Sequence, residues 1–116
     1  MLNRKVFFAV LVFALLHSIP ASAAWTALQA FGTTVTATSD PSCAFLGNGK
    51  AVCAVRTLSH NLAVNVYNGV AWGVAQNLVG VVTSKPSCTD NGAGKVFCVA
   101  RGTTGALFAT IYNGTV

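Results

Sequence analysis

Short apolar runs separated by glycine-rich or polar segments make up most of the chain after residue 40. The runs are five to seven residues long, as strands usually are, and two of them are followed directly by Asn-Gly, a strong turn signal. No run continues into an apolar stripe at helical spacing. The pattern therefore predicts an all-β protein. The expected strands cover residues 51–55, 62–67, 72–78, 79–83, 96–100 and 107–112.

The chain repeats itself with a constant offset of 45 residues. Residues 41–71 align with residues 86–116 without a gap, and twelve of the 31 positions are identical. Pro-Ser-Cys, Gly-x-Gly-Lys and Tyr-Asn-Gly all recur in the same register. Three to four short strands in a unit of about 45 residues are typical of a β-propeller blade. We therefore expect two four-stranded blades.

The cysteines fit a hairpin in each unit. Cys43 and Cys53 are equidistant from Asn48, so a hairpin that turns at residues 47–50 places them opposite each other. The same spacing predicts a disulfide between Cys88 and Cys98. Pairing between the units, Cys43 with Cys88 and Cys53 with Cys98, is the alternative. An even cysteine count without a Cys-x-x-Cys motif favours disulfides over a metal site.

Residues 1–23 have the three parts of a secretory signal peptide. Arg4 and Lys5 are followed by an apolar run over residues 6–16, and Ala21-Ser22-Ala23 fits the small-residue cleavage rule. A membrane anchor is the other interpretation, but eleven apolar residues are too few to cross a bilayer. We expect a mature chain of residues 24–116, secreted or periplasmic, without a transmembrane segment after cleavage.

Charge excludes several functions. The mature chain has five basic residues and two acidic ones, Asp40 and Asp90, so its formal charge is +3. The basic residues form no cluster in the sequence that would indicate nucleic-acid binding. The two carboxylates fall at non-equivalent places in the repeat, whereas glycosidase chemistry needs a close pair. His60 is the one histidine of the mature chain, and Gly105 occupies its equivalent position. We therefore expect no enzyme, no cofactor and no metal.

The second unit resembles a known lectin family. Lys95-Val-Phe-Cys-Val-Ala-Arg-Gly-Thr-Thr-Gly-Ala-Leu-Phe and Ile111-Tyr-Asn-Gly are similar to blades of the Photorhabdus-lectin-like β-propellers. In the first unit, Tyr67-Asn-Gly-Val-Ala-Trp72 fits the same final motif. The resemblance implies a sugar-binding lectin without catalysis. Related bacterial fucose lectins have two blades per chain and form trimers, and their pocket combines arginine, glutamate and tryptophan, although this chain contains no glutamate.

The resemblance suggests sugar-binding residues in both units. Arg56 and Arg101 end a strand and can donate to sugar hydroxyls between blades, or can hold neighbouring backbone carbonyls and close the blade turn. Trp25 and Trp72 can stack on a sugar or fill space between blades. Tyr67 and Tyr112 are the remaining candidates, with packing at the edge of the core as their other role.

The ends of the mature chain suggest self-association. The second unit stops at Val116, where the first continues into Trp72 and its outer strand, and residues 24–31 resemble residues 71–78. We expect the N-terminal strand 24–31 to complete a blade of its own chain or of a neighbour. Two blades cannot close a ring, so the expected assembly is an oligomer, with a trimer of six blades as one form. The alternatives to a lectin are an exported structural or protein-interaction scaffold and a truncated piece of a longer propeller.

Overall fold

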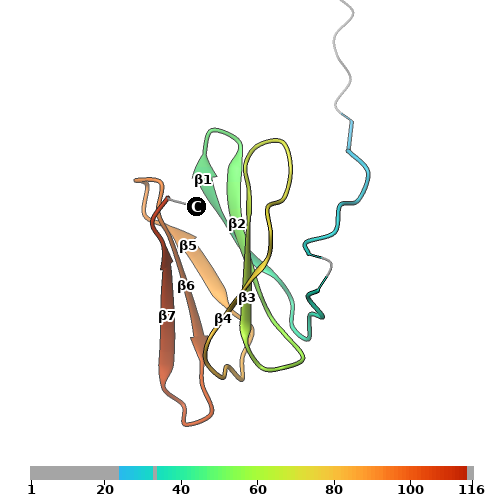
Figure 1. Ribbon diagram of the computed structural model, residues 1–116. Helices are drawn as coiled ribbons and strands as arrows, with labels where there is room; N and C mark the ends of the chain where they lie inside the picture. The colour runs from blue at the N-terminus through green and yellow to red at the C-terminus, as the bar shows by residue number, and fades with distance from the viewer. Residues whose placement is uncertain (1–23, 33, 115–116) are drawn as a thin grey trace, which may run out of the picture.

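The computed structural model describes residues 24–32 and 34–114, and the expected signal peptide lies outside them. Within these ranges the strands form antiparallel sheets of four and three strands, and there is no α-helix (Figure 1). None of the described residues belongs to a helix that could cross a membrane. The all-β prediction is confirmed. The first sheet contains β1 (Ser42–Gly47), β2 (Lys50–Arg56), β3 (Leu62–Tyr67) and β4 (Gln76–Leu78), and the second contains β5 (Ser87–Asp90), β6 (Val96–Arg101) and β7 (Leu107–Tyr112).

Each sheet starts with a hairpin that a disulfide closes. Cys43 lies opposite Cys53 and Cys88 lies opposite Cys98, with Cα–Cα distances of 4.0 and 4.1 Å. The turn between β1 and β2 needs three left-handed residues, with φ of 85° at Gly47, 52° at Asn48 and 73° at Gly49. Glycine and asparagine adopt this conformation at low cost. The pairing within each hairpin is confirmed, and the pairing between units is not found.

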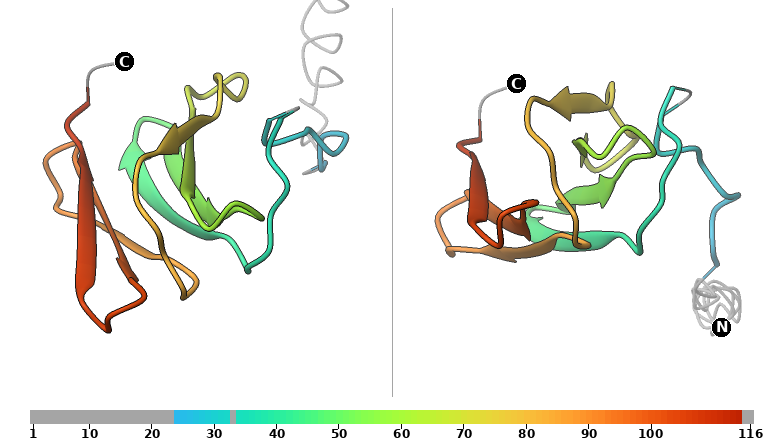
Figure 2. Two further views of the ribbon diagram at one scale, coloured as in Figure 1. Left: turned by 60° about the horizontal axis from the view of Figure 1, so that its bottom comes forward. Right: turned by 90° about the horizontal axis from the view of Figure 1, so that it is seen from below.

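Figure 2 shows the two sheets beside each other. Mostly small aliphatic side chains are buried between them. Strand alternation directs Val52 and Ala54 of β2 towards the second sheet, where Val96, Cys98 and Ala100 of β6 meet them. These five side chains are at most 3% exposed. Burial removes these apolar side chains from water and so stabilises the contact between the sheets.

The outer strands differ from the prediction. Trp72 pairs with Tyr67 only through an isolated bridge, so the strand expected over residues 72–78 shrinks to β4. Residues 79–83 form a connection rather than a strand, because Gly80 has φ of 137°. Residues 24–31 also form no strand, and they lie on the far side of the first sheet from β7 (Figures 1 and 2). The second sheet therefore has three strands where four were expected.

A Thr-Ser pair lies just before each sheet and forms hydrogen bonds with the end of that sheet's second strand, β2 or β6. Ser39 Oγ accepts a hydrogen bond from Arg56 N at 3.0 Å, and Ser84 Oγ accepts one from Arg101 N at 2.9 Å. The hydroxyl of Thr83 donates to the carbonyl oxygens of Arg101 and Gly102, as that of Thr38 does at the equivalent place. The structural repeat thus begins before Pro41, since this pair recurs at the same offset of 45.

We expect removal of either disulfide to destabilise the protein without changing its fold. Each bridge joins residues separated by ten positions, and closing a loop of that size contributes about 2–3 kcal/mol in the entropic model. The variants are Cys43→Ala with Cys53→Ala, and Cys88→Ala with Cys98→Ala. Urea unfolding should give a lower midpoint with a similar slope. A midpoint equal to that of the unmodified protein would contradict the role of the bridge.

Candidate functional site: an aromatic cleft beside the first sheet

An asparagine turn at the end of β3 places two aromatic rings side by side. The side-chain oxygen of Asn68 accepts hydrogen bonds from the N–H groups of Val70 at 2.8 Å and Ala71 at 2.9 Å. The Asn68 N–H donates to the Ala71 carbonyl, which closes the turn. The chain therefore returns with Trp72 opposite Tyr67. Their ring centroids are 5.5 Å apart and the planes are tilted by 56°.

Phe31 supports the other side of Trp72. Its ring centroid lies 5.4 Å from that of Trp72, at a tilt of 55°. Tilted arrangements at this separation are favourable for aromatic pairs. Trp72 is therefore packed between Phe31 and Tyr67 and is only partly exposed. Its indole is held in one orientation by rings from two distant parts of the chain.

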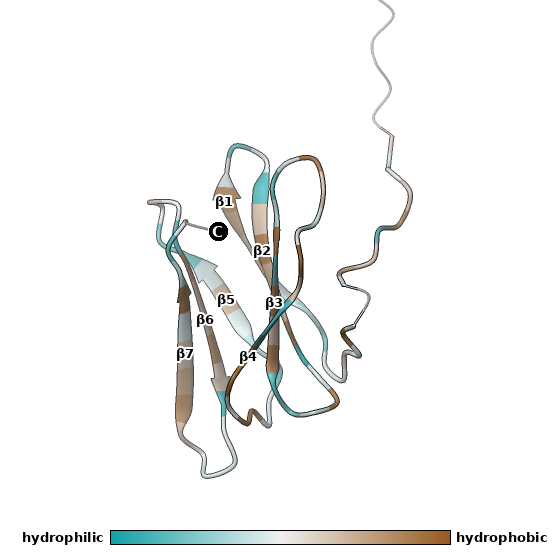
Figure 3. Ribbon diagram, in the orientation of Figure 1, coloured by the Kyte–Doolittle hydropathy of each residue, from teal (hydrophilic) through white to brown (hydrophobic). Residues whose placement is uncertain are grey.

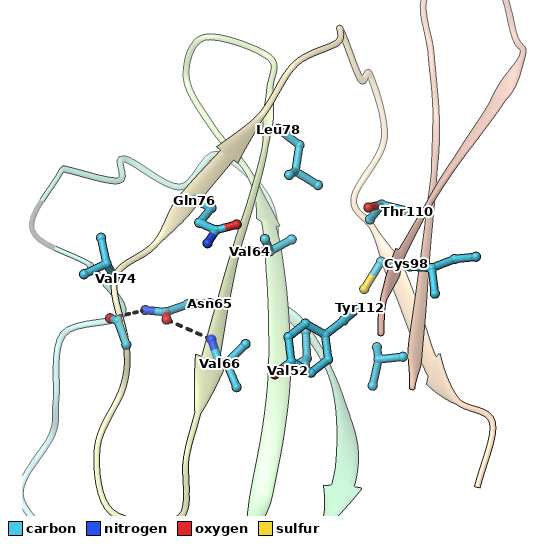
Figure 4. A pocket seen from close by; sticks show the side chains of 13 residues that line it. Val52, Val64, Asn65, Val66, Val74, Gln76, Leu78, Cys98, Thr110 and Tyr112 are labelled. Carbon is cyan, nitrogen blue, oxygen red and sulfur yellow. Dashed lines mark hydrogen bonds between the residues drawn. The ribbon is translucent and has the colours of Figure 1, made fainter. Parts of the chain in front are cut away.

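Asn65 fixes the N-terminal segment against the first sheet. Its side-chain amide donates to the carbonyl oxygen of Phe31. The amide also donates to the carbonyl oxygen of Gly73, and its oxygen accepts the Val66 N–H at 2.8 Å (Figure 4). Asn65 is 2% exposed, so each of these bonds replaces water that burial removes. Asn65 was not among the residues predicted for the site. The one available signal was a single amide inside the apolar run of residues 62–67.

The cleft lies beside Tyr67 and Trp72 and has a volume of about 370 Å³. Trp25 borders it and is fully exposed, so its indole face is open to solvent. A hydroxyl and an amide, from Thr26 and Gln29, complete the polar part of the lining. We call this site the aromatic cleft, defined by Trp25, Thr26, Ala27, Leu28, Gln29, Tyr67 and Trp72. No residue of this lining carries a formal charge.

Tyr112 lies elsewhere, in a cavity between the two sheets (Figure 4). This cavity also has a volume of about 370 Å³, and Val52, Val64 and Leu78 face Cys98 and Thr110 across it. Tyr112 packs against the hydrophobic core from its edge. Three of the six expected site residues, Trp25, Tyr67 and Trp72, therefore meet at the aromatic cleft, and Tyr112 does not.

Arg56 binds backbone carbonyls. Its Nη1 donates to the Thr83 carbonyl at 3.0 Å, and its Nη2 donates to the Thr38 carbonyl at 3.4 Å. Its Nε is buried and has no partner among the described residues. Thr83 belongs to the connection between the sheets, so Arg56 joins the end of β2 to the start of the second unit. Of the two roles considered for Arg56, these contacts fit the holding of neighbouring backbone carbonyls rather than the binding of sugar hydroxyls.

Arg101 has the same place in the second unit but a different environment. It is exposed, and within residues 24–32 and 34–114 its guanidinium donates to no partner. Neither arginine lines the aromatic cleft. The sequence matches no family model, and no curated protein shows significant similarity to it. The geometry of the chain itself therefore carries the functional argument.

Replacing Arg56 should weaken the fold. We expect Arg56→Ala to lower the free energy of unfolding by about 1–3 kcal/mol, because two carbonyl oxygens lose a charged donor. The part-buried bond to the Thr83 carbonyl should account for more of this loss than the exposed bond to the Thr38 carbonyl. Lys50→Ala is the matched control, since Lys50 is an exposed cation at the other end of β2 and should change stability by less than about 0.5 kcal/mol. Urea unfolding measures both. Equal stability of the two variants would show that the carbonyl contacts contribute nothing.

Proposed function

We propose that the protein binds carbohydrate at the aromatic cleft without modifying it. The observation that carries this proposal is the grouping of Trp25, Tyr67 and Trp72 around one open concavity, with an unpacked face on Trp25. Aromatic faces stack on the C–H face of a sugar ring, and nearby hydroxyl and amide groups can bond its hydroxyls. Thr26, Gln29 and the Tyr67 hydroxyl supply such groups here.

A neutral sugar fits the lining better than a charged ligand does. The lining contains no lysine, arginine, aspartate or glutamate, so no side chain there would pair with a phosphate, a carboxylate or an amine. An uncharged ligand loses less hydration free energy on entering such a site. With a volume of about 370 Å³, the cleft also has the size of a small-ligand site.

The binding is proposed to be non-catalytic. Glycoside hydrolysis needs two carboxyl groups on either side of the scissile bond. Asp40 and Asp90 are the acidic residues of the sequence, and neither lines the aromatic cleft. No group in the lining can therefore act as a carboxylic acid or a carboxylate nucleophile. The protein would retain its ligand rather than cleave it.

The sheets are proposed to be blades of a propeller-type fold in an exported protein. Each sheet follows a Thr-Ser pair and begins with a disulfide-closed hairpin, so the two units are built alike. Disulfides of this kind are typical of proteins that work outside the reducing cytosol. A secreted or periplasmic location therefore accompanies the proposed function, because free glycans and glycan-coated surfaces are found there.

Retention on immobilised sugars tests the proposal. The mature protein should be retained on at least one column of a panel that includes fucose, mannose and methylated sugars. Trp25→Ala should weaken binding about two- to tenfold and leave stability unchanged, because the side chain is fully exposed. Trp72→Ala should weaken binding and also lower stability, because Trp72 packs against Phe31 and Tyr67.

Val74→Ala is the matched control for these variants. Val74 is 88% exposed and lies outside the aromatic cleft, so its truncation should change neither retention nor stability. Trp25→Ala with unaltered retention would place binding elsewhere on the molecule. No retention of the native protein on any column would reject carbohydrate binding and favour a scaffold that contacts other proteins.

A further inference from the structure

Asparagine is followed directly by glycine at four places in the chain, residues 48–49, 68–69, 91–92 and 113–114. In such a pair the backbone nitrogen of glycine can attack the side-chain carbonyl carbon of asparagine, because no glycine side chain hinders the approach. Asparagine is accordingly one of the thermolabile residues of proteins. The first three pairs lie in exposed segments between strands, and hydrogen bonds hold them to different extents.

The reaction of such a pair needs water and no other reactant. The glycine nitrogen forms a bond to the side-chain carbonyl carbon, and the bond from that carbon to the amide nitrogen breaks. Ammonia leaves with the proton that the glycine nitrogen loses, and a cyclic imide remains. Water then opens the imide at either carbonyl, which yields aspartate or isoaspartate. The reaction therefore requires a glycine N–H that can lose its proton and a side-chain carbonyl that can turn towards it.

The Asn68 pair is held at the side-chain oxygen. This oxygen accepts the N–H groups of Val70 at 2.8 Å and of Ala71 at 2.9 Å. The Asn68 N–H also donates to the Ala71 carbonyl at 3.1 Å, which fixes the backbone of the turn. The side chain would have to lose both of its hydrogen bonds before its carbonyl carbon could turn towards the Gly69 nitrogen. The fold therefore protects Asn68.

The Asn91 pair is held at both reacting groups. The side-chain oxygen of Asn91 accepts the N–H groups of Ala93 at 3.0 Å and of Lys95 at 3.2 Å. The Gly92 N–H donates to the side-chain oxygen Oδ1 of Asp90 at 3.2 Å. A carboxylate beside this N–H also disfavours the loss of its proton, because a second negative charge would form next to the first. The fold therefore protects Asn91 as well.

The Asn48 pair, at the tip of the β1–β2 hairpin, is held at neither reacting group. Among the described residues, the Asn48 side chain has no hydrogen-bond partner, and neither has the Gly49 N–H. Both residues are exposed, and outside its chain neighbours no atom lies within 4 Å of where a Cβ of Gly49 would stand. Gly47 and Gly49 flank Asn48, and glycine permits rotation of the backbone at low steric cost. The two reacting groups can therefore meet without breaking a hydrogen bond.

We propose that Asn48 is a site of self-modification, at which the chain deamidates through the Gly49 nitrogen while Asn68 and Asn91 react far more slowly. The product carries a new negative charge at the tip of the β1–β2 hairpin. Its isoaspartate form also lengthens the backbone at residue 48. This inference does not depend on the proposed carbohydrate binding.

The modified tip lies against the turn that begins at Asn68. The carbonyl oxygens of Asn48 and Gly49 are 3.7 and 3.8 Å from the position that a Cβ of Gly69 would occupy. A longer backbone at residue 48 therefore changes the contact between the hairpin and this turn. The intact hydrogen bonds of Asn68 keep the turn itself in shape, so the change is confined to the hairpin tip.

Peptide mapping tests the proposal on the mature protein, residues 24–116, incubated at mildly alkaline pH with its disulfides intact. The peptide that contains Asn48 should gain the mass of the acid about tenfold or more faster than the peptides that contain Asn68 and Asn91, because hydrogen bonds must first break at those two sites. The same incubation in urea is the control for the fold. There the three peptides should react at similar rates, since glycine follows each asparagine.

Asn48→Asp supplies the reference for the product. Its peptide should co-elute with the aspartate product of the unmodified protein, and its circular dichroism spectrum should match, because aspartate tolerates the φ of 52° at this residue. Equal rates at the three sites of the folded protein overturn the proposal, as does a faster reaction at Asn68 or Asn91. A lead of Asn48 that persists undiminished in urea also overturns it, because the difference would then come from the neighbouring sequence and not from the hydrogen bonds.

Discussion

The packing of one sheet face on another is the interaction on which the rest of the structure depends. Each sheet has few residues, and neither could bury an apolar face alone. Ala54 and Ala100, together with Val52 and Val96, are buried in the layer between the two sheets. The disulfide at the start of each sheet holds its hairpin in register, so the buried face is presented as a unit.

Polar groups then set the orientation that the apolar layer alone would leave free. Arg56 donates a hydrogen bond to the Thr83 carbonyl, and the Val82 N–H donates one to the His60 carbonyl. Two neighbouring residues of the connection between the sheets are therefore bonded to the first sheet and to the turn between β2 and β3. His60 occupies this turn with φ of 63°, where the second unit has Gly105. The turn keeps its backbone shape in both units, and its carbonyl rather than its imidazole makes the contact.

The sequence predicts the local elements well and the long-range contacts poorly. Hairpins, disulfides and the Asn68 turn follow from spacing and turn chemistry, which act over a few residues. The outer strands were overestimated, because Gly80 and the connection after β4 leave the backbone without a ladder partner. At the site, the meeting of Trp25, Tyr67 and Trp72 depends on Asn65, whose bonds join residues 34 positions apart. Such a contact has no short-range pattern.

The central claim is that the buried layer between the two sheets holds both of them in one fold. Figure 3 shows apolar residues along β2, β3 and β6, the strands that supply most of this layer. Hydrogen exchange of the amides of β2 and β6 tests it most directly. If the sheets are stable only when packed together, the slowest amides of both strands should exchange at one common rate, that of global unfolding. Fast exchange throughout β6 beside slow exchange in β2 would show that the second sheet opens on its own, and would contradict the account.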